Sequence, residues 1–300
     1  MKLLLVVNPI SGGVDKEPFL KAAEVVLKKY GINYRIFKTT GVNDEENVKK
    51  EISDFAPDRV ASVGGDGTTR FTAIALLNSN IPMGIIPQGS ANGMAVELGV
   101  DAEPIQALID ILISDVVRKL DIIKVNGTHR MIHIGDVGIN AQIVDSYEKD
   151  VNRGMATYAK YFIEQLAELT PFKAELKVNG EQINTNALMI GICNARKYGT
   201  GVPLNKEGNP MDGKFELVMI EKVDARLLIR AGLSKFDESF LSSENAKVVS
   251  TKYAEITFDK PYMLQLDGEV IGEHDFLKIE LEEEGVQLIT HGGNPYLKGM

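Results

Sequence analysis

The sequence contains one cysteine and no tryptophan. A single cysteine cannot form an internal disulfide, so we expect the chain to work in a reducing compartment and to fold without covalent cross-links. Cys193 lies in the apolar run "ALMIGICNA", which predicts a small buried side chain on a strand rather than a reactive thiol. No apolar run has the length of a bilayer span, and the run that follows Met1 stops at Val7, too early for a signal peptide. These features predict a soluble, cytoplasmic chain without a transmembrane segment.

Positive charge is also in short supply. The 33 lysines and arginines are outnumbered by 42 aspartates and glutamates, which gives a formal net charge of -9. This balance argues against nucleic acid as a partner and against adhesion of the whole surface to an anionic membrane. Two phosphate-binding signatures are missing: no G-x-x-x-x-G-K-[ST] segment occurs, and no G-x-G-x-x-G follows the first predicted strand. A P-loop enzyme and a dinucleotide-binding Rossmann protein are therefore excluded.

The first 122 residues alternate short apolar runs with amphipathic stretches. The predicted strands are residues 3–7, 33–37, 59–63 and 83–86, and the predicted helices are residues 19–30, 43–55 and 71–77. This order predicts an α/β domain with a parallel sheet and helices on both faces. In such sheets ligands bind beyond the carboxyl ends of the strands.

The pattern changes after residue 122. Alternating segments separated by turn signals such as "VNGT" and "VNGE" predict antiparallel hairpins, because Asn-Gly readily adopts positive φ. We expect a β-sandwich or a two-layer β unit, interrupted by helices at residues 155–169 and 225–241. The fold class is therefore α/β plus all-β.

Glycine-rich turns follow three of the predicted strands. The strongest signal is "GGDGTT" after the strand at 59–63, where the paired glycines allow backbone N–H groups to approach a phosphate. Asp66 is placed to hold Mg²⁺ or to order the phosphates, and Thr68 offers a hydroxyl. An ordinary strand-to-helix turn is the plain alternative, but this combination of residues favours phosphate binding.

The turns "PQGSANG" and "NPISGG" are weaker signals, since Gly, Ser and Asn are also the commonest turn formers. Asn92 in the first of them either hydrogen-bonds a nucleotide or orders its own loop. Together the three turns predict a nucleotide site at one edge of one sheet. Its candidate residues are Asn8, Gly64, Gly65, Asp66, Gly67, Thr68, Thr69, Gly89, Ser90 and Asn92.

Asp267 and Glu269 form the sequence "DGE" after the apolar run "YMLQL". Two carboxylates two residues apart on a strand face the same side, unless Gly268 makes a bend. Crowding of the two carboxylates would then suit one of them to act as a general base towards a hydroxyl. The alternative is an exposed hairpin turn, which composition alone favours.

The segments "NPISGG", "VGGDGTT", "PQGSANGMA" and "LDGE", in this order and spacing, resemble the diacylglycerol kinase catalytic-domain family, which includes bacterial lipid kinases, sphingosine kinases and ceramide kinases. The resemblance runs nearly end to end. It implies an ATP-binding domain of residues 1–122 and 287–300, a β-sandwich of residues 123–286 that takes the lipid substrate, and an active site in the cleft between them.

The resemblance also implies the chemistry: an ATP-dependent lipid kinase that transfers the γ-phosphoryl group to a lipid hydroxyl, with Mg²⁺, in phospholipid biosynthesis. Thr39, Ser90 and the residues from Gly65 to Thr68 would contact ATP, and Glu269, aided by Asp267, would activate the hydroxyl. The implied partner is a lipid at a membrane surface, reached peripherally at the inner face, and a homodimer is allowed. The implied metal residues are Asn209, Asp212 and Lys214.

Several positions depart from the family pattern. Arg70 and Phe71 stand where an Asn-Glu pair is common, Gly93 where an acid is common, and Gly13 where many members carry a lysine. Of the Asp–Lys–metal network of some members, Asp121 remains, and Arg70 or Lys16 is left to hold the phosphates. Two other functions stay open: a kinase of a soluble substrate such as NAD, and a catalytically weak nucleotide-binding scaffold.

Overall fold

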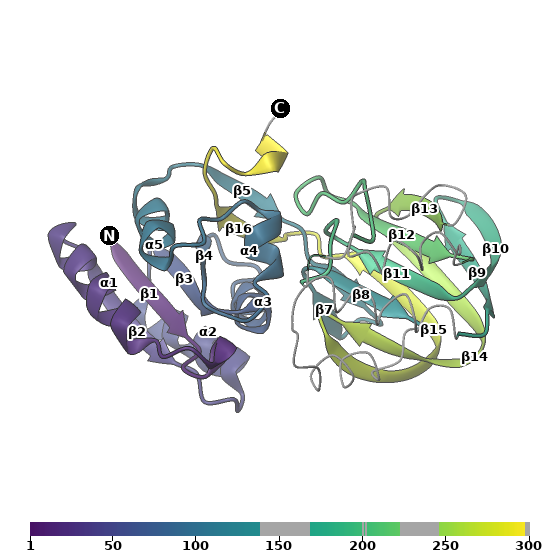
Figure 1. Cartoon of the computed structure of the whole chain (residues 1–300), viewed down its shortest axis with the longest axis horizontal. Helices are drawn as coiled ribbons and strands as arrows, with labels where there is room; N and C mark the ends of the chain where they lie inside the picture. Colours follow the sequence, from purple (N-terminus) through teal and green to yellow (C-terminus); the bar gives the residue numbers. More distant parts are fainter. Residues whose placement is uncertain (139–168, 200, 202, 223–245, 298–300) are drawn as a thin grey trace, which may run out of the picture. The chain divides into compact units, whose positions relative to one another are not determined.

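The chain forms two compact units in a computed structural model that describes residues 1–138, 169–199, 201, 203–222 and 246–297 (Figure 1). The first unit comprises Met1–Leu120 and Glu283–Met300, and the second comprises Asp121–Glu282. These boundaries lie at 120 and 282, whereas the sequence placed them at 122 and 286. The difference has a structural cause: Val286, assigned to the sandwich from the sequence, begins a strand that pairs with Leu120 in the first unit.

The first unit is built on a six-stranded sheet. Its strands, in spatial order, are β2 (Asn33–Lys38), β1 (Lys2–Val7), β3 (Arg59–Gly64), β4 (Met83–Pro87), β16 (Val286–Ile289) and β5 (Val117–Leu120). The pairings from β2 to β16 are parallel, as predicted, but β5 pairs antiparallel to β16 at the edge of the sheet. The C-terminal part of the chain therefore completes the N-terminal sheet.

Helices cover both faces of this sheet. They are α1 (Glu17–Lys29), α2 (Asp44–Phe55), α3 (Asp66–Ala75), the short α4 (Gly93–Glu97) and α5 (Pro104–Ile113), with 3₁₀ turns at η1 (Ser11–Gly13) and η2 (Pro295–Leu297). Helices α1 and α5 share one core with alternate residues of β1, among them Leu3, Leu5 and Val7, while α2 packs against α3. This core fixes the strands whose carboxyl ends carry the candidate turns.

Helix α3 begins at Asp66 rather than at Phe71 as the sequence predicted. The amide of Thr69 donates to the carbonyl of Gly65 at 3.0 Å, so the helix starts directly after the glycine pair. Asp66 is favoured in a first helical turn because its carboxylate opposes the positive end of the helix dipole. The "DGTT" segment is thus the first turn of a helix, not a loop.

The described residues of the second unit form an antiparallel β-sandwich of ten strands. Eight of them follow the spatial order β13 (Ala246–Thr251), β12 (Phe215–Ile220), β11 (Met189–Cys193), β8 (Ile134–Val137), β14 (Tyr253–Leu266), β15 (Glu269–Leu281), β6 (Ile123–Val125) and β7 (His129–Met131). The remaining two, β9 (Phe172–Val178) and β10 (Glu181–Ala187), pair with each other, and β9 also pairs with β14.

The long strand β14 joins the two layers of the sandwich. Its first half pairs with β9 over Ala254–Phe258, and its second half pairs with β8 over Leu264–Leu266. The pairing of β14 with β15 shifts register between Thr257 and Tyr262, which is the kind of irregularity that bends a strand. Apolar residues of both layers enclose one core that includes Phe172, Ile192 and Leu264.

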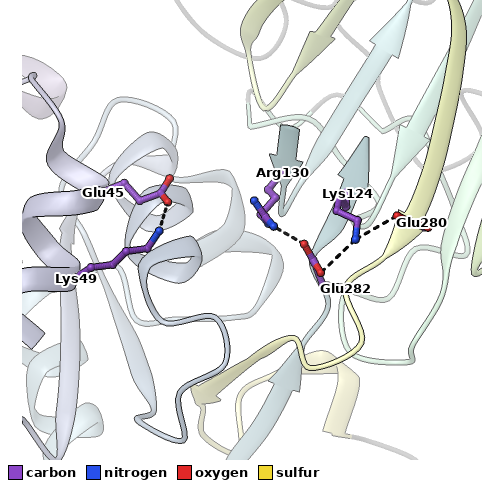
Figure 2. A network of polar contacts seen from close by, with 6 residues as sticks. All are labelled: Glu45, Lys49, Lys124, Arg130, Glu280 and Glu282. Atoms are coloured by element: carbon purple, nitrogen blue, oxygen red, sulfur yellow. Dashed lines mark hydrogen bonds and ion pairs between the residues drawn. The ribbon is translucent and has the colours of Figure 1, made fainter. Parts of the chain in front are cut away.

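Charged side chains fasten β6 and β7 to the end of β15. Lys124 Nζ lies 3.1 Å from Glu280 Oε1 and 3.6 Å from Glu282 Oε2, and Arg130 Nε donates to Glu282 Oε1 at 2.7 Å (Figure 2). The hydrogen bond from Lys124 lowers the pKa of Glu280, and the same bond raises the pKa of Lys124. The figure also draws the pair of Glu45 with Lys49, one turn apart on α2.

Two other predictions can be compared with the fold, and a third cannot. Cys193 is fully buried on β11, as predicted, and burial raises the pKa of its thiol well above the ordinary value. Within the described ranges, no helix is long and apolar enough to cross a bilayer. The helices predicted at residues 155–169 and 225–241 fall outside the described residues, apart from residue 169.

Candidate functional site

Three glycine-rich turns meet at the carboxyl edge of the first sheet, as the sequence predicted. A Cβ placed on Gly89 would lie 2.3 Å from Cα of Gly65, and one placed on Gly12 would lie 2.8 Å from the carbonyl carbon of Gly89. Ser11 belongs to the same contact, since its Oγ would lie 3.3 Å from a Cβ on Gly65. Only glycine allows the backbones to approach this closely, and glycine-rich turns at a strand end are typical of phosphate sites.

Asp66 connects two of these turns. Its Oδ2 accepts a hydrogen bond of 2.9 Å from the amide of Gly93, and its Oδ1 accepts one of 2.9 Å from the amide of Met94. Both amides open helix α4, so the carboxylate caps that helix while standing in the first turn of α3. Asp66 therefore orders the site, and its contact with the nucleotide phosphates or Mg²⁺ stays a prediction.

Asn92 orders its own loop, which was one of the two roles open to it. Its Oδ1 accepts from the amide of Gly89 at 2.7 Å, and its Nδ2 donates to the carbonyl of Gly89 at 3.0 Å. The residue has φ of 55°, a left-handed conformation that asparagine tolerates better than most residues. Ser90 lies in this loop next to Gly89, and it is exposed.

The threonines of the site differ in their surroundings. Thr69 Oγ1 donates to the carbonyl of Gly65 at 3.2 Å, which stabilises the start of α3. Thr39 is buried just after β2, where its amide donates to the carbonyl of Val7 at 2.9 Å. Across the described chain, the buried Oγ1 of Thr68 has no hydrogen-bond partner, and it would lie 2.4 Å from a Cβ on Gly64. Thr68 is thus the hydroxyl with unused hydrogen-bonding capacity.

The loop after β1 is held by a lysine. Lys16 is 3% exposed, and its Nζ donates to the carbonyls of Ser11 at 2.6 Å and of Val14 at 2.7 Å. Burial lowers the pKa of Lys16, partly opposed by the charge of Asp15. Asn8 Oδ1 accepts from the amide of Ile10 at 3.2 Å at the start of the same loop. In this structure Lys16 stabilises the loop after β1 through these two hydrogen bonds, whereas the sequence had suggested it as a ligand of the phosphates.

In the second unit, Asp267 and Gly268 form a two-residue turn between β14 and β15, with φ of 50° and 85°. Two positive φ values at a two-residue hairpin turn are typical of type I′ geometry. Gly268 therefore makes the bend that the sequence had left open, and the two carboxylates do not share one strand face as residues two apart on a strand would. The hairpin turn, which composition favoured, is what the structure contains.

The two carboxylates of this turn have different surroundings. Asp267 Oδ2 accepts from the amide of Ile132 and Oδ1 from the amide of His133, each at 2.9 Å, while its own amide donates to the carbonyl of Ile134 at 3.0 Å. Glu269 is exposed at the first position of β15. Asp267 thus anchors the turn to the segment before β8, and Glu269 is the more accessible carboxylate.

The residues predicted to hold a metal lie in a turn before β12. Asp212 Oδ1 accepts from the amide of Lys214 at 3.0 Å, and Asn209 Oδ1 accepts from the amide of Met211 at 3.1 Å. Asp121 fastens this turn, because its Oδ2 accepts from the amide of Gly213 at 2.7 Å and its own amide donates to the carbonyl of Pro210 at 2.8 Å.

Partial burial raises the pKa of Asp212 despite the nearby charge of Lys214. A bound cation would relieve that desolvation, and carboxylate with main-chain carbonyl oxygens is the donor set that Mg²⁺ and Ca²⁺ prefer. This donor chemistry suits such a cation, whose binding at Asp212 stays a prediction. No cluster of three or more His, Cys, Asp or Glu side chains suited to a metal occurs among the described residues.

Sequence reasoning did not single out a buried polar group near the turn formed by Asp267 and Gly268. Asp136 on β8 is 2% exposed, and its Oδ2 accepts hydrogen bonds from Tyr198 Oη at 2.9 Å and from Gln265 Nε2. The only available signal was an acid inside the otherwise apolar strand of residues 134–137. A buried acid of this kind needs partners, and these come from distant parts of the chain.

The chain thus combines an α/β unit that carries a cluster of glycine turns with a β-sandwich that carries a D-G-E hairpin. Comparison with known proteins gives the family. The model of the diacylglycerol kinase catalytic domain matches residues 2–125, and that of the YegS C-terminal NAD kinase beta sandwich-like domain matches residues 134–289. The chain therefore belongs to the diacylglycerol kinase catalytic-domain family, whose kinases are phosphotransferases.

Individual relatives agree with this assignment. A diacylglycerol kinase of Bacillus subtilis is 25% identical over 275 residues, with 89% of each chain covered. A "Probable lipid kinase YegS-like" protein of Yersinia enterocolitica is 28% identical over 272 residues, covering 87% of this chain and 88% of that protein.

Solved structures show the same fold. A diacylglycerol kinase of Bacillus anthracis has a TM-score of 0.73 at 19% identity over 98% of both chains. An NAD kinase of Archaeoglobus fulgidus in complex with ATP has a TM-score of 0.56 at 15% identity, covering 97% of this chain and 94% of that one.

Proposed function

We propose that this protein is an ATP-dependent lipid kinase, which transfers the γ-phosphoryl group of Mg-ATP to a hydroxyl group of a lipid. The observation that carries the nucleotide half of the proposal is the close contact of Gly12, Gly65 and Gly89 at the carboxyl edge of the sheet. The lipid half is supported by the family and by the names of the relatives.

The nucleotide would be held mainly by main-chain groups. Amides of the three turns would donate to phosphate oxygens, and the unpartnered hydroxyl of Thr68 together with the exposed hydroxyl of Ser90 would add side-chain donors. Asp66 would keep the turns at Gly65 and Gly89 in register through its bonds to the start of α4. The Mg²⁺ that accompanies ATP would enter as part of the substrate.

Glu269 would act as the general base. Its carboxylate would take the proton of the lipid hydroxyl as the hydroxyl oxygen forms a bond to the γ-phosphorus, and the bond from that phosphorus to the bridging oxygen breaks to release ADP. Asp267 would serve by holding the turn, because both of its oxygens already accept main-chain hydrogen bonds. The protein's task in this reaction is positioning and charge neutralisation.

A second cation would have a structural role. The cation would be held by the carboxylate of Asp212 and by main-chain carbonyls at positions such as Asn209 and Lys214. It would stiffen this turn, which is hydrogen-bonded to Asp121 just before β6. When bound, this cation supplies a positive charge to an acidic turn. No chemical step needs to pass through it.

The substrate would be reached at a membrane surface, at the inner face of the cell membrane, without a spanning segment. Residues 225–241 combine apolar positions with Arg226, Arg230 and Lys235, which suits either such contact or packing on the sandwich, and they lie outside the described residues. The hydroxyl would belong to a diacylglycerol-like or a sphingoid-like lipid, and the product would be a phosphorylated lipid that feeds phospholipid biosynthesis.

The test is an assay of the purified protein with γ-labelled ATP and Mg²⁺ against diacylglycerol, sphingosine and ceramide in mixed micelles, with NAD as a soluble acceptor. We expect label in one or more lipids and little in NADP. Label in NADP alone would establish the second candidate, an NAD kinase. This candidate is included because an NAD kinase of Archaeoglobus fulgidus has a similar fold. ATP binding without transfer to any acceptor would favour a nucleotide-binding scaffold.

A further inference from the structure

A chain of hydrogen bonds leads from a buried carboxylate to the turn that presents Glu269. Asp136 Oδ2 accepts from Gln265 Nε2, and Gln265 Oε1 accepts from the amide of Gly268 at 2.8 Å. Gly268 directly precedes Glu269 in the sequence. The side chain of Gln265 therefore spans the space between the buried acid and the peptide next to the proposed base.

The buried acid dictates how Gln265 is oriented. A side-chain amide has one end that donates and one end that accepts. Asp136 and Gln265 are directly opposite each other on β8 and β14, and the NH₂ group of Gln265 faces Asp136. Its carbonyl oxygen is then left to accept from Gly268. Tyr198, whose hydroxyl donates to the same oxygen of Asp136, holds the acid from another segment.

The turn is thus fastened on both of its residues. The carboxylate of Asp267 accepts hydrogen bonds from the amides of Ile132 and His133, and the side chain of Gln265 accepts one from the amide of Gly268. Gly268 has φ of 85° and no side chain, so its backbone reaches other conformations easily unless it is anchored. Two anchors on consecutive residues fix the direction in which the chain enters β15, where Glu269 is the first residue.

We propose that Gln265 and Asp136 are positioning residues for Glu269 and act on it through the amide of Gly268. This inference rests on the proposed function, because it assigns the two residues a purpose only if Glu269 accepts the proton of the lipid hydroxyl. Under this inference Glu269 is the acid that reacts, whereas Asp136 and Asp267 hold the turn. The proposed nucleotide turns belong to the other unit, so we expect ATP binding to survive when this chain of bonds is broken.

The first experiment measures kcat, KM for ATP and melting temperature for Gln265→Leu, with Gln265→Met as a second variant that keeps the unbranched side chain. The control is Gln182→Leu, which changes an exposed strand glutamine in the same unit. We expect kcat to fall about tenfold, less than the roughly 10²–10⁴-fold value of the base itself, with KM for ATP unchanged. The control retains wild-type kcat.

The second experiment repeats Gln265→Leu in a Glu269→Gln background. A positioning residue has nothing left to position once the base is gone, so the effect of Gln265→Leu on kcat should disappear. A residue that only supports the fold lowers kcat by the same factor in both backgrounds. An equal loss of kcat in both backgrounds overturns the inference. So does wild-type kcat in both Gln265 variants while Glu269→Gln is impaired. Neither outcome contradicts the proposed function.

The third variant, Gln265→Glu, adds a readout from pH. An ionised glutamate places a second negative oxygen against Asp136, whereas a protonated one donates to Asp136 and accepts from Gly268 as glutamine does. The ratio of its kcat to that of the wild type should therefore rise as pH is lowered. A ratio independent of pH contradicts the inference. Wild-type kcat in Glu269→Gln would instead refute the base assignment of the proposed function.

Discussion

The carboxylate of Asp66 is hydrogen-bonded to the main-chain amide of Met94 at 2.9 Å, which links the first turn of α3 to the first turn of α4. Its other oxygen accepts from the amide of Gly93 at the same distance. One side chain therefore fixes two of the three turns of the candidate nucleotide site relative to each other. We therefore expect the stability of this region and the affinity for ATP to depend on the same residue.

Asp66→Ala is expected to abolish turnover, weaken Mg-ATP binding and lower the melting temperature. Two buried amides lose their acceptor, and each unsatisfied buried donor costs about 1–3 kcal/mol. Calorimetry with ATP and thermal unfolding measure the two effects. The control is Asp54→Ala, an exposed acid near the end of α2, which should change neither. Unaltered ATP affinity in Asp66→Ala would place the nucleotide elsewhere.

Gly89→Ala tests the contact between turns. The added methyl group would lie 2.3 Å from Cα of Gly65, so one turn must move. We expect the affinity for ATP to fall about tenfold, the equivalent of roughly 1.4 kcal/mol. Gly292→Ala is the matched control, since a Cβ there meets no described atom within 4 Å. If both variants bind ATP like the wild type, the glycine contact is not part of the nucleotide site.

Glu269→Gln and Asp267→Asn should differ in kind. Glu269 is exposed, so its change should lower kcat by roughly 10²–10⁴-fold and leave the melting temperature unchanged. Asp267→Asn puts an NH₂ group against one of two main-chain amides and should cost about 1–3 kcal/mol of stability, with a loss of kcat that follows from the loosened turn. ATP affinity should survive in both. Wild-type turnover in both variants leaves the base unassigned.

Removal of the structural cation should lower the melting temperature by a few degrees, because a ligand that binds only the folded state stabilises it by mass action. EDTA added to the wild type tests this by thermal unfolding. Asp212→Ala should have the lower melting temperature already and should no longer respond to EDTA. Asp275→Ala, an exposed acid on β15, should respond like the wild type. Insensitivity of the wild type to EDTA argues against the cation.

Lys124→Met should destabilise the second unit by about 0.5–1 kcal/mol near neutral pH, the usual range for a partly exposed ion pair. Because the pKa of Glu280 is lowered from 4.5, the pair stabilises the fold above that pH and ceases to do so as pH falls through the lowered value. The difference in unfolding free energy between variant and wild type should therefore vanish in acid. A difference that persists there would point to packing of the lysine stem.

Local sequence patterns determined much of the first unit. Apolar runs bounded by glycine or proline marked β1, β3 and β4, because buried parallel strands need continuous apolar residues and their turns need residues that tolerate unusual φ. The same patterns located the three turns of the candidate nucleotide site. They failed at the start of α3, since the glycines of "GGDGTT" concealed that its last four residues already form a helix.

The sequence by itself thus determined the two-domain organisation, the family and the glycine turns, since each depends on residues close together in the chain. Only the tertiary structure decided what the acids do. Asp66 bonds to amides 27 and 28 residues away, Asp267 to amides 135 and 134 residues away, and Gln265 to an acid 129 residues away. A carboxylate that reacts and one that anchors a turn look alike in a sequence, because the difference lies in which distant main-chain groups the fold brings to their oxygens.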